Sequence, residues 1–308
     1  MDYEEVLITK IAWYYYMGNM TQQQIADVLG TSRVRVNKLL DKARSEGIVQ
    51  FKIRNDSAQR IEIEKNLVKK YSLTDAFTVP SIPGDNNGMD QIAENIARGA
   101  ASYIADRITQ DIFINFGYGN TIGKLINHLA MISEHPFSCV SLTGGVNYYL
   151  PNTTSSTFNA KLYLMPMPLI ASSKEMADAM RKERSVTEIN KMLPHSILTV
   201  VGIGSMAETA TVLKEQTLTK HDFLIMRMNG AVGDVLSHFM DKDGNLISSP
   251  IEDRLISTPL STLKSLRNVI GVAGGDEKIQ AIKAALLGGY IDILITDEET
   301  AVELLELD

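Results

Sequence analysis

The sequence has few of the residues that build disulfide frameworks, metal sites and membrane spans. Its 308 residues include one cysteine, Cys139, which excludes an internal disulfide and a cluster of thiolate zinc ligands. The five histidines show no metal-ligand spacing. The apolar runs are short and interrupted, and none reaches the ~20 residues of a membrane-spanning helix. We therefore expect no metal, no other cofactor and no membrane segment.

The N-terminus also lacks the features of a secretory signal. Asp2, Glu4 and Glu5 make it acidic, whereas a signal is basic and then apolar. Hydrophobic content of 44% and charged content of 22% are ordinary for a globular protein, and 308 residues are enough for two domains. These features predict a cytoplasmic protein.

Residues 20–47 have the pattern of a helix-turn-helix motif. Thr21 can cap a first helix, and Gly30 can end it because glycine adopts left-handed backbone angles cheaply. Ser32 can cap a second helix, which would enter the DNA major groove with its N-terminus first. The apolar positions of the two helices are Ile25, Ala26, Val28 and Leu29, then Val36, Leu39, Leu40 and Ala43.

Basic residues concentrate in this part of an acidic chain. Residues 31–54 hold seven lysines and arginines against two acids, a local charge of +5, whereas the whole chain carries −7 and the other residues therefore sum to −12. Any helical hairpin exposes some basic residues, but a basic island on an acidic chain is typical of binding to DNA phosphates. The predicted DNA-binding residues are Thr21, Gln22, Ser32, Arg33, Arg35, Asn37, Lys38 and Lys42.

Helices and a strand are predicted on both sides of this motif. Residues 4–17 form a helix whose aromatic cluster, Trp13 to Tyr16, is expected to pack in a core rather than stack on bases. The alternating residues 48–53 are typical of the strand of a wing. Residues 61–71 form a helix that is either a linker or a partner for its own copy in a second subunit.

From about Ser72 the pattern changes to alternating strands and helices, which favours a doubly wound, mainly parallel α/β domain. The predicted strands span residues 76–80, 111–116, 138–143, 162–166, 197–203, 269–274 and 291–296. The predicted helices span residues 89–107, 120–131, 174–193, 276–287 and 298–306. Residues 232–248 instead predict an antiparallel hairpin with an Asp-Gly turn. The expected organisation is a helix-turn-helix domain at residues 1–55 and an effector and oligomerisation domain at residues 56–308.

Three predicted strands end in glycine-rich loops, at residues 116–121, 142–147 and 272–278. In open parallel sheets ligands bind beyond the carboxyl ends of the strands, and glycines there let backbone N–H groups approach an anion. Glycine after a strand can also simply make the turn. Three such loops, with Thr143 and Lys278 in place, favour an anion site the size of a phosphate.

Other motifs narrow the chemistry. The loop G-Y-G-N-T-I-G has the wrong glycine spacing for a dinucleotide fingerprint, and no acid ends the next strand where a ribose would need it, so a nicotinamide cofactor is not expected. Asp234 lies among small residues, where it would either accept hydrogen bonds from sugar hydroxyls or cap a turn. No nucleophile elbow or Walker lysine loop supports a hydrolase or nucleotidase.

Together these residues resemble the SorC family of bacterial sugar-responsive transcriptional regulators. The N-terminal stretch A-W-Y-Y-Y-M-G-N-M-T-Q-Q-Q-I-A-D-V-L-G-T-S-R-V-R-V-N-K-L-L-D-K-A-R-S-E-G-I-V looks like the family's helix-turn-helix signature nearly end to end. The later motifs L-T-G-G, V-V-G-I-G, G-A-V-G-D and G-V-A-G-G-D-E-K-I-Q-A-I continue the resemblance. The set is similar to the branch that includes regulators of autoinducer-2 uptake and of erythritol-type polyol use.

The resemblance implies a winged DNA-binding domain joined to an effector domain that is related to sugar-phosphate isomerases and has lost catalysis. It also implies a tetramer built as a dimer of dimers, and a phosphorylated sugar or polyol as effector. Asn120 stands where many members have the arginine of W-G-R-T, which suits a singly phosphorylated or smaller ligand. The implied effector-binding residues are Tyr118, Gly119, Asn120, Thr143, Gly144, Gly145, Asp234, Gly275 and Lys278.

Two functions are compatible with these patterns. The first is a repressor that binds double-stranded operator DNA and is controlled by the sugar phosphate. The second is an active sugar-phosphate isomerase with an appended DNA-binding domain. Catalysis needs a general base at the reacting carbon, and Asp234 is the one motif-placed candidate, without an assignable partner acid or histidine. We therefore favour the regulator of a carbohydrate or polyol operon.

Overall fold

The computed structural model describes residues 3–50, 58–80, 88–145, 149, 160–214 and 218–307. The chain divides into two compact units, which we describe separately: helices α1 to α3 belong to the first, and α4 and all later elements belong to the second. No helix of these described ranges is long and apolar enough to cross a bilayer.

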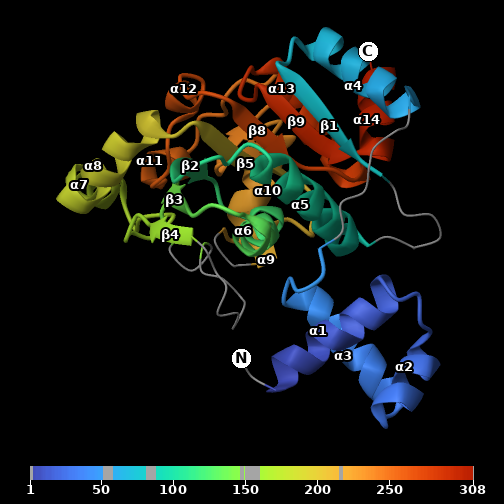
Figure 1. Ribbon diagram of the computed structural model, residues 1–308. Coiled ribbons are helices and arrows are strands. Elements are labelled where there is room, and N and C mark those ends of the chain that lie inside the picture. Colours follow the sequence, from blue (N-terminus) through green and yellow to red (C-terminus); the bar gives the residue numbers. More distant parts are fainter. Residues whose placement is uncertain are drawn as a thin grey trace. The chain divides into compact units, whose positions relative to one another are not determined.

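The first unit contains α1 (Tyr3–Tyr16), α2 (Gln22–Leu29) and α3 (Arg33–Ser45) (Figure 1). Thr21 opens α2 with a capping box, in which its backbone N–H donates to Gln24 Oε1 at 2.8 Å and its hydroxyl accepts from the Gln24 N–H. Gly30, at φ 61°, ends the helix. The Ser32 Oγ then accepts the Arg35 N–H at 3.2 Å and starts α3. The predicted helix-turn-helix is confirmed.

Fewer apolar residues are buried in the core of this unit than the sequence pattern indicated. Val28, an apolar position of α2, is 62% exposed. Tyr14, Tyr15 and Tyr16 pack against the core, but Trp13 is 59% exposed, so the prediction of core packing is wrong for Trp13. The reason is helical register: Ile8 and Ile11 turn one face of α1 toward the core, and Trp13 lies on the other face. Residues 48–50 form no strand, and the rest of the predicted wing strand, 51–53, lies outside the described residues.

Seven strands of the second unit pair in parallel in the order β1-β9-β8-β5-β2-β3-β4. Alternate side chains of each strand enter different cores because successive Cβ atoms point to opposite faces. In β5, for example, Val200 belongs to one core cluster and Val201 to the other. The strands are β1 (Asp75–Val79), β2 (Ile112–Phe116), β3 (Phe137–Ser141), β4 (Ala160–Tyr163), β5 (Leu198–Ser205), β8 (Val269–Val272) and β9 (Ile293–Asp297).

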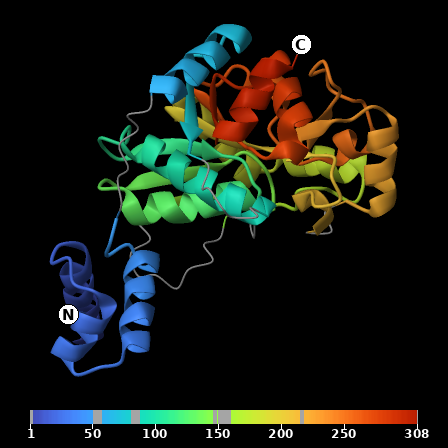
Figure 2. The same ribbon diagram turned by 90° about the vertical axis from the view of Figure 1, so that its right-hand side faces the viewer.

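Helices cover both faces of this sheet, so the doubly wound α/β prediction is confirmed. Helices α5 and α6 lie side by side on one face in both views (Figures 1 and 2), and their apolar residues enter the first core cluster. Helices α4, α8, α13 and α14 contribute to the second cluster. The helices are α4 (Ala58–Tyr71), α5 (Met89–Ala105), α6 (Asn120–Ile132), α7 (Lys174–Lys182), α8 (Arg184–Met192), α9 (Thr211–Lys214), α10 (Lys220–Met228), α11 (Pro250–Arg254), α12 (Leu260–Leu263), α13 (Ile279–Leu287) and α14 (Glu298–Glu306), with short 3₁₀ turns η2 (Leu193–His195) and η3 (Asp276–Lys278).

Two element predictions need correction. The helix predicted at 174–193 is broken at Glu183, whose extended backbone (ψ 141°) separates α7 from α8. The antiparallel hairpin of β6 (Gly233–Val235) and β7 (His238–Met240) exists, but it turns at Leu236 and Ser237, both at positive φ. The predicted Asp-Gly turn at residues 243–244 comes after β7, where the Asp241 carboxylate accepts two backbone N–H groups.

Helix α4 packs on its own chain. Ile63 and Leu67 are buried in the second core cluster, and the Tyr71 hydroxyl donates to the Leu304 carbonyl of α14 at 2.8 Å. The Lys70 ammonium donates to the Leu305 carbonyl at 3.0 Å. This helix is therefore part of the second unit rather than a linker, and its buried apolar residues do not require a second subunit.

Candidate ligand pocket and nucleic-acid interface

A cavity of about 1220 Å³ opens beyond the carboxyl ends of the parallel strands, where open α/β sheets bind ligands. The loop after β2 contributes Tyr118 and Gly119, and the end of β5 contributes the run from Gly202 to Ser205. The first turns of α5 and α6 close one side. The antiparallel β6 and the turn after β8 bring in two charged residues, Asp234 and Lys278.

The N-terminus of α6 faces this cavity without a side-chain cap. Gly119 is the N-cap residue at φ 128°, a conformation that favours glycine, and its carbonyl accepts the Gly123 N–H at 2.8 Å. The first N–H groups of a helix have no acceptor within it, and the helix dipole adds partial positive charge there. Asn120, Thr121 and Ile122 supply these groups and line the cavity. This end of α6 is suited to an anion.

Asp234 places a carboxylate in the pocket wall. Its Oδ2 accepts the Ser237 N–H at 2.9 Å. Its Oδ1 lies so close to Gly204 that a Cβ added to this glycine would be 2.0 Å from it. Burial raises the pKa of Asp234 to about 6, against the opposing effects of the Ser237 hydrogen bond and the charge on Lys278. This carboxylate is available to accept hydrogen bonds from ligand hydroxyls.

Lys278 brings a cation to the same wall. Burial lowers the pKa of the Lys278 ammonium, while the charges of Asp234 and Glu277 favour its protonated form. Among the described residues, no carboxylate lies within 4.0 Å of its Nζ and no hydrogen bond engages it. The ammonium is thus available for an anionic ligand.

The glycine loop after β3 turns its polar groups into the protein. The Gly144 N–H donates to the Ile256 carbonyl at 2.8 Å, and the Gly145 N–H donates to the Met167 carbonyl at 2.7 Å. The Thr143 hydroxyl bonds the Gly144 carbonyl and the Tyr149 hydroxyl. A Cβ on Gly144 would lie 2.3 Å from the Pro168 carbonyl oxygen. Close packing against the Pro168 carbonyl therefore explains the glycine at 144.

In the loop after β8, the backbone N–H of Gly275 is likewise engaged within the protein. The Gly275 N–H donates to the Thr300 hydroxyl at 2.7 Å and the Asp297 carboxylate at 3.1 Å. Of the nine predicted effector residues, three do not line the cavity: Thr143, Gly144 and Gly275. The other six line it: Tyr118, Gly119, Asn120, Gly145, Asp234 and Lys278.

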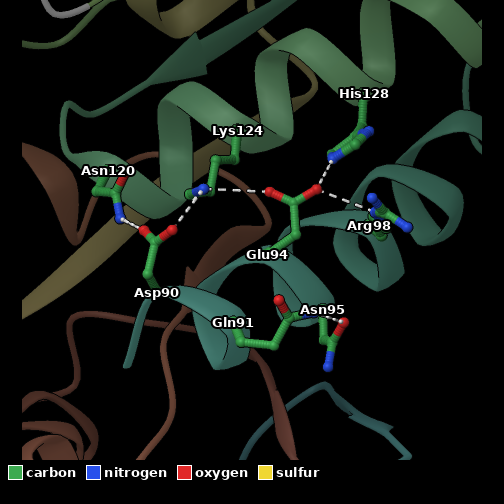
Figure 3. A network of polar contacts seen from close by, with 8 residues as sticks. All are labelled: Asp90, Gln91, Glu94, Asn95, Arg98, Asn120, Lys124 and His128. Atoms are coloured by element: carbon green, nitrogen blue, oxygen red, sulfur yellow. Dashed lines mark hydrogen bonds and ion pairs between the residues drawn. The ribbon is translucent and has the colours of Figure 1, made fainter. Parts of the chain in front are cut away.

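A polar network between α5 and α6 borders the pocket and was not predicted from the sequence (Figure 3). The Asp90 carboxylate accepts from Asn120 Nδ2 at 2.9 Å and lies 3.4 Å from Lys124 Nζ. Glu94 contacts Lys124 at 3.2 Å and His128 at 2.8 Å. The hydrogen bond from His128, with the nearby lysine, lowers the pKa of Glu94 to about 2. Asp90, Asn120 and Lys124 line the cavity.

Three further hydrogen bonds position the hairpin that carries Asp234. The Tyr118 and Ser237 hydroxyls share a hydrogen bond, which joins the end of β2 to the hairpin turn. His238 is buried, with Nδ1 2.7 Å from Glu252 Oε1 and Nε2 3.0 Å from the Thr258 carbonyl oxygen. These bonds hold β6 at a fixed position beside the cavity.

In the first unit, the predicted DNA-binding residues divide into two groups. Arg33, Arg35, Asn37 and Lys38 have exposed side chains on α3. Gln22 links α2 to that surface, since its Nε2 donates to Asn37 Oδ1 at 3.1 Å and its Oε1 accepts from Arg33 Nε at 3.4 Å. Gln22, Arg33 and Asn37 are thus joined by hydrogen bonds.

The second group has internal roles. The hydroxyls of Thr21 and Ser32 accept backbone N–H groups as helix caps. Lys42 lies 2.9 Å from the Glu4 carboxylate and 3.7 Å from that of Glu46, so its charge is already paired in this unit. Side chains engaged in this way are less available to phosphates than those of the first group.

Comparison with known proteins gives matches over nearly the whole chain. Residues 55–306 match the family model described as "Putative sugar-binding domain", and residues 16–65 match a Crp-like helix-turn-helix domain. The transcriptional regulator LsrR of Escherichia coli (strain K12) is 31% identical over 306 residues, which cover 98% of this chain and 95% of that protein. LsrR of Klebsiella pneumoniae is 30% identical over 308 residues, with 99% and 94% covered.

Solved structures agree with this match. The crystal structure of the full-length sorbitol operon regulator SorC from Klebsiella pneumoniae has a TM-score of 0.71 and 27% identity, and 99% of each chain is covered. These relatives are described as transcriptional regulators and not as enzymes. The alternative of an active sugar-phosphate isomerase is therefore not retained.

Proposed function

The chain belongs to the SorC family of sugar-binding transcriptional regulators, and on this premise we propose that a phosphorylated sugar or polyol in its pocket controls its binding to operator DNA. Residues 1–55 serve as the DNA-binding domain, and residues 56–308 bind the effector and mediate oligomerisation. The protein acts in the cytoplasm, where its DNA target lies. Its role is that of a repressor of a carbohydrate or polyol catabolic operon.

The observation that carries this proposal is that three groups line one cavity: the uncapped end of α6, the Lys278 ammonium and the Asp234 carboxylate. A ligand phosphate accepts N–H bonds from the first turn of α6 and pairs with Lys278. Hydroxyls of the same ligand donate to Asp234. Charge-assisted hydrogen bonds are roughly twice as strong as neutral ones, so the phosphate supplies most of the affinity.

The phosphate contact differs from the one implied by family resemblance. The N–H groups of Gly144, Gly145 and Gly275 are engaged within the protein, so we keep Lys278 as the cation and assign the N–H contacts to the first turn of α6. Gly145 remains a lining residue that shapes the pocket. Tyr118 and Asn120 border the ligand from the β2 side.

Calorimetry with matched ligand pairs tests the effector. Tetrose, pentose and hexose phosphates, and polyol phosphates, are each titrated beside the unphosphorylated compound and inorganic phosphate. We expect at least one phosphorylated member to bind far more tightly than its unphosphorylated partner. If no phosphate binds, or if a free sugar binds as tightly as its phosphate, the phosphate-anchored pocket is wrong.

The effector can control DNA binding only if its affinity differs between two arrangements of the protein. A ligand shifts an equilibrium only when it binds one arrangement of the protein better than another. Gel shift on the DNA upstream of the neighbouring operon, with and without the ligand found by calorimetry, is the direct measurement. An unchanged DNA affinity at saturating ligand would contradict effector control while leaving the pocket assignment intact.

We also propose a homo-oligomer, a tetramer built as a dimer of dimers as the family resemblance implies. One recognition helix reads too few base pairs for specificity, and operators of helix-turn-helix proteins mirror the symmetry of a dimer. The buried face of α4 gives no support for this, because α14 and β1 already cover it. Light scattering should give a mass above that of the 34.0 kDa chain. A monomer with and without DNA would contradict the proposal.

A further inference from the structure

The recognition helix carries an exposed apolar side chain that its own unit does not use. Val34 is the second residue of α3 and is 68% exposed. It stands between Arg33 and Arg35, on the most polar helix of the unit. Valine is a poor helix former, so neither packing nor helix propensity accounts for it at this position.

Helical register places Val34 on the outermost line of α3. The buried residues Val36, Leu39, Leu40 and Ala43 define the core face. Residues four and seven positions apart share a face of a helix, so Val34, Lys38 and Asp41 lie together on the opposite face. Arg33 and Arg35 lie on the two flanks of this line.

Contacts on the flanks hold the surrounding side chains to the protein. On one flank, Gln22 hydrogen-bonds both Arg33 and Asn37. On the other flank, Lys42 pairs with Glu4 of α1. Asp41 pairs with Arg44. Within the described part of the chain, no hydrogen bond or ion pair engages the Lys38 ammonium, and Val34 has no polar group to engage.

We propose that Val34 is a base-reading residue whose methyl groups contact the C5-methyl of a thymine. This inference rests on the DNA-binding function of the chain. The first turn of a recognition helix enters the major groove first. The thymine methyl is the apolar group that base pairs present there. Lys38, one turn further, then lies over the next bases, while Arg33 and Arg35 bind the phosphates on either side.

The test is a cycle that pairs one protein change with one DNA change. The full-length wild-type protein first selects duplexes from a randomised library, and each invariant dT is then replaced by dU, which removes only the C5-methyl group. We expect the replacement of dT by dU at one position per half-site to weaken wild-type binding about fourfold, which is the factor for one buried methyl-sized group. Val34→Ala should weaken binding to the dT duplex by a similar factor or more.

The coupling between the two changes decides the proposal. If Val34 contacts that methyl group, Val34→Ala should discriminate dT from dU less than the wild-type protein does, because two of the contacting methyl groups are lost. Val28→Ala is the matched control, since Val28 is 62% exposed on α2, and it should keep the wild-type preference for dT. Additive losses in the cycle, or a Val34→Ala protein with wild-type affinity and dT preference, would overturn the proposal.

Folding and general DNA binding are controlled separately. Alanine forms helices better than valine, so Val34→Ala should keep the helical circular dichroism signal, and a loss of affinity cannot come from an unfolded helix. Val34→Thr keeps the side-chain shape but replaces one methyl group by a hydroxyl, and it should reduce the preference for dT. If the wild-type protein selects no sequence at all, sequence-specific DNA binding itself fails, which is distinguishable from failure of the Val34 contact.

Discussion

The recognition helix was predicted from helical spacing and the effector pocket from glycine-rich loops, and the two differ in how many of the predicted polar groups remain available to a ligand. On α3, Arg33, Arg35 and Lys38 are exposed as expected. Of the residues predicted for the pocket, Gly144, Gly145 and Gly275 use their N–H groups inside the protein. The face of a helix is set by local spacing, whereas the direction of a loop N–H is set by distant partners such as Ile256 and Met167.

The largest expected effect is the loss of effector affinity when Lys278, a polar group that faces the cavity, is replaced. Lys278→Met should weaken binding of the phosphorylated effector by about 2–3 kcal/mol, since a hydrogen bond to a charged group is lost, and DNA binding without effector should not change. Calorimetry and gel shift measure the two. Lys191→Met, an exposed lysine paired with Glu188, is the control.

Thr143→Val tests a polar group that faces the protein rather than the cavity. Thr143 is buried and bonds Tyr149, so its loss should lower thermal stability and leave effector affinity within about threefold of wild type. A large loss of affinity in this variant, with Lys278→Met unaffected, would show that the phosphate lies on the β3 loop after all.

The next effect concerns the recognition helix. The double variant Arg33→Ala/Arg35→Ala should weaken operator binding by about 2 kcal/mol and lower the slope of log affinity against log salt by ~2, because two phosphate contacts disappear. Lys42→Ala should change that slope less, since its charge is paired with Glu4. Fluorescence anisotropy at several salt concentrations measures both. Equal slopes for all three proteins would contradict the division into exposed and internally engaged residues.

A pH effect comes from Asp234. Its pKa is raised to about 6 in the folded state from 3.8, so the folded protein binds more protons than the unfolded chain between these values. The free energy of unfolding therefore falls as pH rises through this window, and the cost is fully present above about pH 6. Asp234→Asn should unfold with a free energy about 1–2 kcal/mol higher at pH 7. The difference should disappear near pH 4, as urea denaturation at both pH values will measure.

The smallest effect concerns the network between α5 and α6. The Asp90 carboxylate holds Asn120 and Lys124 beside the end of α6. Asp90→Asn removes a negative charge there, and we expect phosphate-containing ligands to bind about threefold more tightly. Asp178→Asn, which removes an exposed carboxylate paired with Arg181, should leave affinity unchanged. Weaker binding after Asp90→Asn would mean that the network positions the pocket rather than opposing the anion.

The type of most helices and strands could be predicted from the sequence, because the spacing of apolar residues and the presence of turn residues are local signals. The predicted strand at 111–116 is found at Ile112–Phe116, and the predicted helix at 298–306 has the predicted bounds. The turn at Leu236 and Ser237 was missed because neither residue is glycine or asparagine, the usual residues at positive φ.

Contacts between elements were not predictable in the same way. Asp90, Glu94 and Arg98 follow one another at four-residue spacing on α5, as do Asn120, Lys124 and His128 on α6. That spacing marks one face of each helix, and it is visible in the sequence. Nothing in the sequence says that the two faces meet, since the order of strands in the sheet decides which helices are neighbours.

The close approach of Asp234 to Gly204 restricts the order in which this pocket can diverge. Any side chain at residue 204 would place its Cβ 2.0 Å from the Asp234 carboxylate oxygen. A substitution at residue 204 therefore requires the Asp234 carboxylate to move away from the Ser237 N–H that it accepts, and we expect it to be tolerated better in a descendant that has a smaller residue at 234. A lineage that keeps the acid is thus expected to keep the glycine with it. Saturation of residue 204 in wild type and in Asp234→Ala should reveal this dependence as a set of substitutions accepted better in the second background.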